Sequence, residues 1–412
     1  MAVVELSAAR SSAGARAEQV ARASYGRLLA IIAAQTGDIA AAEDALGDAF
    51  ERALAAWPHD GVPTNPEAWL VTVARRRHLD TVKSAANRLS APLDLQVAAF
   101  DRIDLEAIPD KRLELMFVCA HPAIDAAVRT PLMLQTVLGF DAAFIAQAYA
   151  VPATAMAQRL VRAKRRIRLA RVPFVVPLRD DMPARLPFVL EAVYGAYAID
   201  WQLVSGPKVR DSLAAEALYL AKTLAVLLGD EPEALGLAAL IAFSLARADA
   251  RVAADGCLVP LAEQDRTLWR PDLVREGETL LRRAHALGRV GRFQLEAAMQ
   301  SAQCAAVRPD ARALLALHDA LVRVSPTLGA RVARAAVIAE CDGPRAGLDE
   351  LQKIDGADRF QPAWATRAHL LAALGETDAA ASAFAKAISL TTDAPSRLYL
   401  ARRAAEVRPS DR

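Results

Sequence analysis

The stretch from Phe140 to Arg171 constrains this chain more than any other, because it predicts two short helices joined by a tight turn. Val151-Pro152 separates the helices, since proline disfavours a helical residue before it but fits the first turn of the next helix. The first helix is expected to bury Phe144, Ile145, Ala148 and Tyr149. The second carries apolar residues at the intervals of one helix face: Met156, Leu160, Ala163 and Ile167. Together these features predict a helix-turn-helix.

The second helix of this pair carries charge of a single sign. Between Ala153 and Arg171 there are seven cations and no acid: Arg159, Arg162, Lys164, Arg165, Arg166, Arg168 and Arg171. Helix surfaces in globular domains usually mix both signs, so this pattern favours a polyanionic partner. A solvated basic face is the alternative interpretation. DNA binding is favoured because the turn, the apolar stripe and the charge coincide.

Composition predicts an all-α fold of several domains. The chain has 412 residues, of which 54% are hydrophobic, many of them alanine, and only 5% aromatic. Alanine is the strongest helix former. The net charge of +2 excludes no class of partner, but the cations gather in two runs, Arg75–Lys83 and Arg159–Arg171. Such local patches are sufficient to hold DNA phosphates.

The sequence gives no sign of a metal site, a cofactor or a membrane segment. Its four cysteines are widely spaced, which is typical of a reduced compartment and not of a zinc site. The N-terminus lacks the apolar core of a signal peptide, and the longest apolar run, Ala234–Ala246, is too short to span a bilayer. A cytoplasmic protein is expected. No Ser-His-Asp order, phosphate loop or paired-carboxylate motif points to an enzyme.

Three amphipathic helices are predicted before residue 85. The first covers about 18–35, and the second runs from about Ile39 to Trp57, capped by Asp38. The third starts at Pro66 after the cap residue Asn65. The second helix is expected to point these residues inward: Ala42, Leu46, Ala49, Phe50, Ala53, Leu54 and Trp57. Its outward face is mostly acidic, whereas that of the third is basic.

The remainder divides at two segments without helical periodicity, 86–110 and the proline-spaced 173–186. Beyond residue 186 successive amphipathic helices follow, which calls for a repeat test. Residues 361–391 match the tetratricopeptide pattern best, with these packing positions: Trp364, Ala368, Leu371, Gly375, Ala380, Phe384 and Ala387. Because one repeat cannot bury its own faces, neighbouring helix pairs should stack on it.

Three motifs carry a family resemblance. GDIAAAEDALGDAFERALAAWP, NPEAWLVTVARRRHLDTVK and VPATAMAQRLVRAKRRIR resemble RNA polymerase sigma factors of the extracytoplasmic-function (ECF) group, in the subgroup with a long C-terminal tetratricopeptide-like extension. The resemblance covers nearly the whole chain. It departs from the subgroup at Ala120, where a second cysteine is usual, and at VLEAVYGAYAIDW, where an Asn-Glu-Gly step is usual.

The resemblance implies five segments. Residues 1–85 would be sigma region 2, 86–110 a linker, 111–172 sigma region 4 with the helix-turn-helix, 173–186 a second linker, and 187–412 a helical extension. Core polymerase would be bound by Asp44, Asp48, Phe50, Glu51 and Trp57. The −10 element of the promoter would be bound by Trp69, Arg75, Arg76, Arg77 and Lys83. The −35 element would be bound by Thr154, Gln158, Arg159, Arg162, Lys164, Arg165 and Arg166.

These implications lead to two functional hypotheses. In the first, the chain binds core RNA polymerase, directs it to promoter DNA, and is regulated by its extension through a protein or ligand on the repeats. In the second, it is a helix-turn-helix regulator with a helical-repeat sensing scaffold that does not bind polymerase. The second leaves the acidic helix 44–57 beside a separate basic helix unexplained. A packing role without any ligand is the alternative interpretation of the extension.

Overall fold

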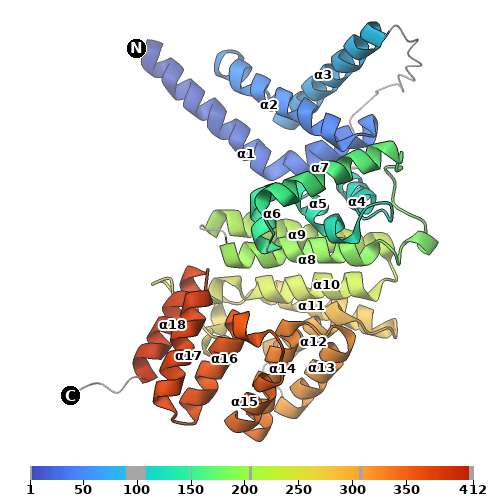
Figure 1. Cartoon of the computed structure of the whole chain (residues 1–412). Coiled ribbons are helices and arrows are strands. Elements are labelled where there is room, and N and C mark those ends of the chain that lie inside the picture. Colours follow the sequence, from blue (N-terminus) through green and yellow to red (C-terminus); the bar gives the residue numbers. More distant parts are fainter. Residues whose placement is uncertain (1, 90–107, 150, 204–206, 306–309, 408–412) are drawn as a thin grey trace. The chain divides into compact units, whose positions relative to one another are not determined.

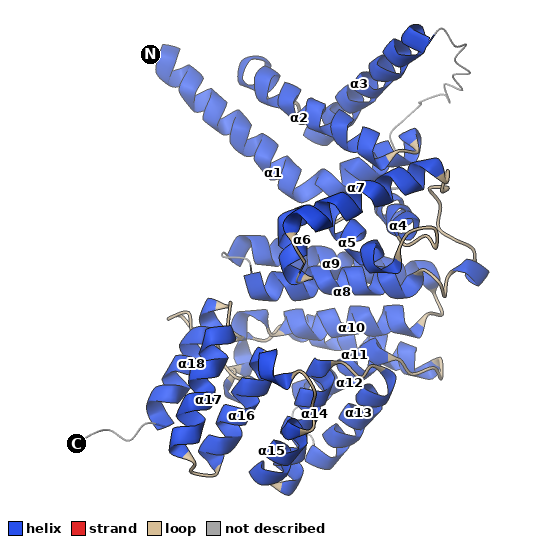
Figure 2. Cartoon of the chain, in the orientation of Figure 1, coloured by secondary structure: helices blue, strands red, loops and turns tan. Residues whose placement is uncertain are grey.

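The computed structural model describes residues 2–89, 108–149, 151–203, 207–305 and 310–407. These residues form helices joined by turns, and none of the described segments forms a strand beyond an isolated bridge between Val252 and Leu258 (Figure 2). The predicted all-α class is confirmed. Within the described residues, no helix combines the length and the apolarity needed to cross a membrane. The chain separates into two compact units, Met1–Ala196 and Tyr197–Arg412.

The first unit contains seven helices among its described residues, followed by the start of an eighth (Figure 1). They are α1 (Ala2–Thr36), α2 (Ile39–Asp60), α3 (Pro66–Leu89), α4 (Ile108–Cys119), α5 (Ala126–Thr136), α6 (Ala142–Ala148), α7 (Ala153–Leu169) and α8 (Leu186–Leu203). Both predicted caps are present: Asp38 Oδ1 accepts from Ala40 N at 3.0 Å, and Asn65 Oδ1 accepts from Ala68 N at 3.0 Å.

The predicted segment boundaries shift in two places. α3 continues to Leu89, four residues beyond the expected limit of 85, and α4 begins at Ile108, so part of the predicted linker 86–110 is helical. The rest of that linker lies outside the described residues. The first unit also includes the beginning of the extension, because α8 packs on α5: the guanidinium of Arg129 lies 4.5 Å from the centre of the Phe188 ring.

A close approach between α1 and the end of α5 holds the first unit together. A Cβ at Gly26 would lie 1.8 Å from the carbonyl oxygen of Val137, so only glycine permits this contact. Leu28, Leu29 and Ile32 on the same helix are fully buried. The first three helices therefore share a core with α4 and α5.

The second unit is built around α10 (Pro232–Ala246), whose residues are buried almost without exception. A helix that is apolar on all sides is expected at such a position. α9 (Pro207–Leu228), α11 (Pro271–Ala286) and α12 (Arg292–Cys304) pack around it. Glu233 of α10 caps α12, because its carboxylate accepts from the amides of Phe293 and Gln294 at 3.0 and 3.1 Å.

Helical hairpins complete the second unit. They are formed by α13 (Ala311–Val324), α14 (Leu328–Asp342), α15 (Pro344–Gln352), α16 (Gln361–Ala373), α17 (Thr377–Leu390) and α18 (Ala394–Val407). The repeat predicted at 361–391 corresponds to the α16–α17 hairpin. Its positions Ala368, Ala380, Phe384 and Ala387 are buried as predicted, and Gly375 makes the turn with φ +75°.

Candidate functional site

The predicted helix-turn-helix consists of α6 and α7. Asp141 begins α6 by accepting from Phe144 N at 2.7 Å. The carbonyl of Pro152 accepts from Met156 N at 3.0 Å, which starts α7 directly after the turn. The stripe Met156, Leu160, Ala163 and Ile167 is buried. The prediction for α6 is partly wrong, because Ile145 is buried but Ala148 and Tyr149 are exposed, at the end of a helix of 7 residues.

The face of α7 opposite this stripe is exposed and basic. The exposed residues include six of the seven predicted to contact the −35 element: Thr154, Gln158, Arg159, Arg162, Arg165 and Arg166. In the described part of the chain, no ion pair involves these four arginines. Their guanidinium groups are therefore available to an external polyanion.

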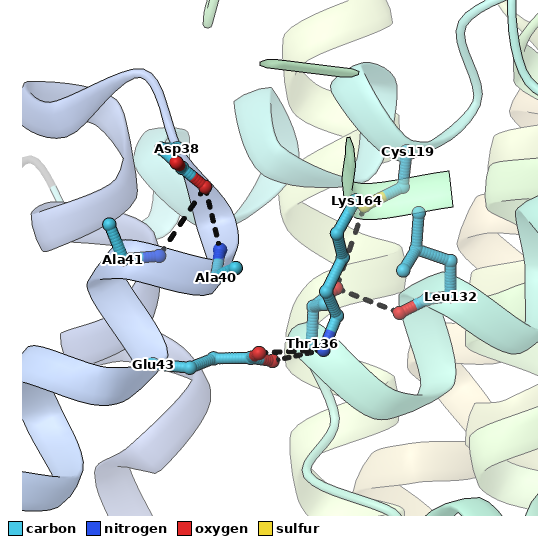
Figure 3. A network of polar contacts seen from close by, with 8 residues as sticks. All are labelled: Asp38, Ala40, Ala41, Glu43, Cys119, Leu132, Thr136 and Lys164. Atoms are coloured by element: carbon cyan, nitrogen blue, oxygen red, sulfur yellow. Dashed lines mark hydrogen bonds and ion pairs between the residues drawn. The ribbon is translucent and has the colours of Figure 1, made fainter. Parts of the chain in front are cut away.

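Lys164, the seventh predicted contact, lies elsewhere. Its side chain is buried and its Nζ contacts both carboxylate oxygens of Glu43 on α2 at 2.6 Å (Figure 3). The physical reason is its position, four residues after Leu160 and three before Ile167, which places it at the edge of the buried stripe. A buried ammonium needs a partner of opposite charge, and Glu43 supplies it.

The surroundings of this ion pair are buried and hydrogen-bonded. Thr136 Oγ1 donates to the carbonyl of Leu132 at 2.8 Å and lies 3.5 Å from Cys119 Sγ (Figure 3). Burial raises the pKa of the Cys119 thiol to about 12, although Thr136 and Lys164 act in the opposite direction. The thiol is therefore neutral and serves as packing. Asp38 forms a second ion pair between the start of α2 and α7. Its Oδ2 lies 3.1 Å from Arg168 Nη1, while its Oδ1 caps α2.

The acidic face of α2 is exposed at Asp44 and Glu51, as predicted. Trp57 is buried. Two inward predictions were wrong: Phe50 is half-buried, and Leu54 is 54% exposed. Leu54 follows Glu51 by three residues and therefore lies on the acidic face. The face thus combines carboxylates with apolar side chains, a combination that protein interfaces use.

The basic residues predicted on α3 divide into two groups. Arg76 and Lys83 are exposed to solvent. Arg75 Nε donates to Gln35 Oε1 at 2.7 Å, and Arg77 Nε donates to Asp48 Oδ2 at 2.5 Å. The contact with Asp48 raises the pKa of Arg77.

Trp69 is half-buried, with its ring centre 5.6 Å from that of Trp57 in an edge-to-face arrangement. Such aromatic pairs prefer this geometry. The buried part of the Trp69 side chain thus packs between α2 and α3, and the remaining part is exposed to solvent.

Two residues important for this arrangement were not singled out from the sequence. Glu43 looked like one more acid on an outward face, and no sequence signal pairs it with a lysine 121 residues later. Gly26 carries only a weak signal, because a glycine inside a helix costs about 1 kcal/mol relative to alanine, yet a Cβ at Gly14 or Gly47 would meet nothing within 4 Å. Among the described residues, no three His, Cys, Asp or Glu side chains are placed to share a metal ion.

Comparison with known proteins agrees with this geometry. The family described as sigma-70 region 2 matches residues 20–88, the segment that forms the C-terminal half of α1 together with α2 and α3. An uncharacterized protein of Rhizobium meliloti, R00370, is 33% identical over 372 residues, covering 87% of this chain and 88% of that protein. A probable ECF RNA polymerase sigma factor of Mycobacterium tuberculosis, SigI, is 29% identical over 160 residues, covering 37% of this chain and 54% of SigI.

Residues 20–88 form a sigma-70 region 2 domain, and part of the chain is similar to an ECF sigma factor. Its long extension includes residues 185–285, which match a family of unknown function, DUF6596. No solved structure is significantly similar to this sigma factor. The exposed faces of α2 and α3 therefore lie within the matched sigma-70 region 2 domain, and roles for them and for α7 are proposed below.

Proposed function

We propose that this sigma factor binds core RNA polymerase through the exposed face of α2 and directs it to promoters, with α3 contacting the −10 element and α7 the −35 element. The observation that carries the proposal is α7, whose buried apolar stripe turns four arginines toward solvent, none of them in an ion pair within the described residues. Residues near the start of such a helix reach base edges and later cations hold phosphates. Thr154 and Gln158 are thus candidates for reading bases.

The polymerase supplies the chemistry in this proposal, so the chain needs no catalytic site and works in the cytoplasm beside the polymerase. The extension is proposed to regulate the sigma domains. Its helical hairpins offer surfaces for a protein or ligand, and it makes up more than half of the chain.

Run-off transcription with purified core polymerase tests both parts. We expect transcripts from the cognate promoters only when the protein is added. A chain ending after Leu203 removes the extension but retains α8, whose Phe188 covers Arg129. A changed transcript yield supports regulation, and an unchanged yield argues against it. Failure of the full chain to bind core polymerase would instead favour a DNA-binding regulator that acts alone.

Arg162→Ala is expected to weaken promoter binding by the polymerase complex and to lower its salt dependence. Loss of one phosphate contact reduces the slope of log K against log salt concentration by about 1. The measurement is filter binding or fluorescence anisotropy at several salt concentrations. Arg283→Ala, which removes an equally exposed arginine from α11, is the matched control. Equal slopes for both variants would exclude Arg162 from the DNA interface.

Glu51→Arg is expected to weaken binding to core polymerase by about tenfold, because like charges at an interface repel and 1.4 kcal/mol corresponds to a factor of ten. Glu51 is exposed, whereas Asp48 accepts a hydrogen bond from Arg77 and would disturb α3 if changed. Asp349→Arg makes the same charge reversal at an exposed position of α15. Unchanged affinity for Glu51→Arg, measured by biolayer interferometry, would remove this face from the polymerase interface.

A further inference from the structure

The second unit buries two arginine side chains at the end of α10. Arg247 follows the helix directly and is 5% exposed, and Arg251 lies four residues later and is 8% exposed. Neither residue belongs to the surfaces proposed for DNA or polymerase. Buried guanidinium groups are uncommon and are normally paired with charge of the opposite sign.

Both guanidinium groups donate to neutral oxygens, and Arg251 also forms a side-chain hydrogen bond with Tyr197. Arg251 Nη2 donates to the carbonyl and the hydroxyl of Ser244 at 2.9 and 3.0 Å. Arg247 Nη2 donates to the amide oxygen of Gln300. Burial lowers the pKa of Arg251 to about 10, and the nearby Arg247 lowers it further while Tyr197 raises it. The two cations are therefore close enough to repel each other.

A third arginine and a tryptophan extend this cluster toward solvent. The guanidinium carbons of Arg266 and Arg247 lie 5.0 and 5.9 Å from the ring centre of Trp269. The indole Nε1 of Trp269 is buried and has no hydrogen-bond acceptor in the part of the chain that is described. Arg266 is exposed and donates to the carbonyl of Ala305 at 2.7 Å. An indole N–H without an acceptor costs free energy when it is buried.

The start of α11 adds to the positive potential. This helix begins at Pro271, two residues after Trp269, and the side chain of its cap residue Arg270 makes no capping hydrogen bond. The N-terminus of a helix carries partial positive charge and favours anions. Three acids lie on α11: Asp272 is 3.7 Å from Arg270, Glu276 forms an ion pair with Lys222, and Glu278 raises the pKa of the Cys304 thiol. Arg247, Arg266 and Arg251 lower the pKa of the same thiol.

We propose that Arg247, Arg266 and the indole N–H of Trp269 form a binding site for the oxyanion group of a small molecule, a carboxylate or a phosphate. Guanidinium groups match both by donating two parallel hydrogen bonds. The anion would accept from the indole N–H and compensate the buried positive charge. The site lies within residues 185–285, the segment with no assigned function. It does not depend on the proposed roles in polymerase or promoter binding.

Thermal unfolding of the full chain tests the site with two probes, inorganic phosphate and succinate, each titrated against sodium chloride at constant ionic strength. Ligand binding to the folded state alone raises Tm, and we expect a saturable rise of about 5 °C. A rise with phosphate alone assigns a phosphate ligand, and one with succinate alone assigns a carboxylate. No saturable rise with either probe would overturn the proposal.

Cys304 provides a local readout that general salt effects do not share. A bound anion would screen the three arginines, raise the pKa of the thiol and slow its alkylation by iodoacetamide, because the thiolate is the reactive form. We expect at least a threefold slower reaction at Cys304 and an unchanged rate at Cys341 on α14. Equal effects at both cysteines would overturn the proposal.

Two substitutions distinguish a binding site from a structural cluster. Arg266→Met and Trp269→Phe keep side-chain bulk but remove a hydrogen-bond donor. Each should raise the probe concentration that gives half of the maximal rise in Tm at least tenfold. Arg283→Met on α11 is the control and should leave it unchanged. If Arg266→Met and Trp269→Phe bind the probes as the unaltered chain does, the cluster has a structural role only.

Discussion

Gly26→Ala is expected to loosen the first unit, although alanine is the better helix former. The new Cβ would lie 1.8 Å from the carbonyl oxygen of Val137 and 2.7 Å from its carbonyl carbon. Both atoms belong to the backbone, so α1 and the end of α5 must move apart. Overpacking of this kind costs about 1–3 kcal/mol or more, which exceeds the gain of about 1 kcal/mol in helix propensity.

Hydrogen exchange followed by mass spectrometry measures this effect in the full chain. Amides of α1 and α5 should exchange faster in Gly26→Ala, because the free energy of local opening falls. Gly14→Ala is the matched control on the same helix, since a Cβ there meets nothing within 4 Å. It should preserve or increase protection. Equal exchange in the two variants would mean that the contact between Gly26 and Val137 is not needed for stability.

Phe384→Ala is expected to destabilise the last hairpins by about 3–5 kcal/mol, the usual cost of removing a buried phenylalanine. The side chain is fully buried in a cluster with Ala368, Ala387 and Leu400. Its ring also lies 5.1 Å from that of His369 in an edge-to-face arrangement. Three of the buried residues in this cluster, Ala368, Ala383 and Ala387, are too small to fill the cavity.

The effect of Phe384→Ala should be confined to α16, α17 and α18, and hydrogen exchange would detect it there. Leu398→Ala on α18 removes a side chain that is 44% exposed and should change protection little. Loss of protection throughout the second unit would show instead that its hairpins unfold together with α10. No loss in α17 would contradict the assigned core position of Phe384.

Features that depend on local sequence could be predicted. The stripe of α7 follows from apolar residues at helical spacing, and Asp38 and Asn65 cap helices as their positions indicate. The buried positions of the 361–391 repeat follow from the same periodicity. These features need only contacts within one helix or one hairpin, so the sequence pattern contains the information.

Features that depend on distant partners could not be predicted. The six cations of α7 look alike in the sequence, but Lys164 faces Glu43 of α2 while Arg162 faces solvent. Phe50 and Leu54 were predicted to point inward because they are apolar. The structure leaves Phe50 half-buried and Leu54 exposed, since no other helix covers them fully. In the same way, the buried Arg247 after α10 depends on Gln300 of α12 and on Trp269 in the loop before α11.

The two ion pairs on α2 limit what the first unit can do on DNA in this arrangement. Asp48 holds Arg77 of α3 and Glu43 holds Lys164 of α7, and five residues of helix separate these acids by only about 7.5 Å. Promoter elements centred near −10 and −35 lie about 25 base pairs apart, which is about 85 Å of duplex at 3.4 Å per pair. The reach of α3 and α7 is therefore far too short to span both elements while both pairs persist. Occupying both elements as proposed therefore requires the ion pair between Glu43 and Lys164 to open, so this pair favours an arrangement that promoter binding must undo.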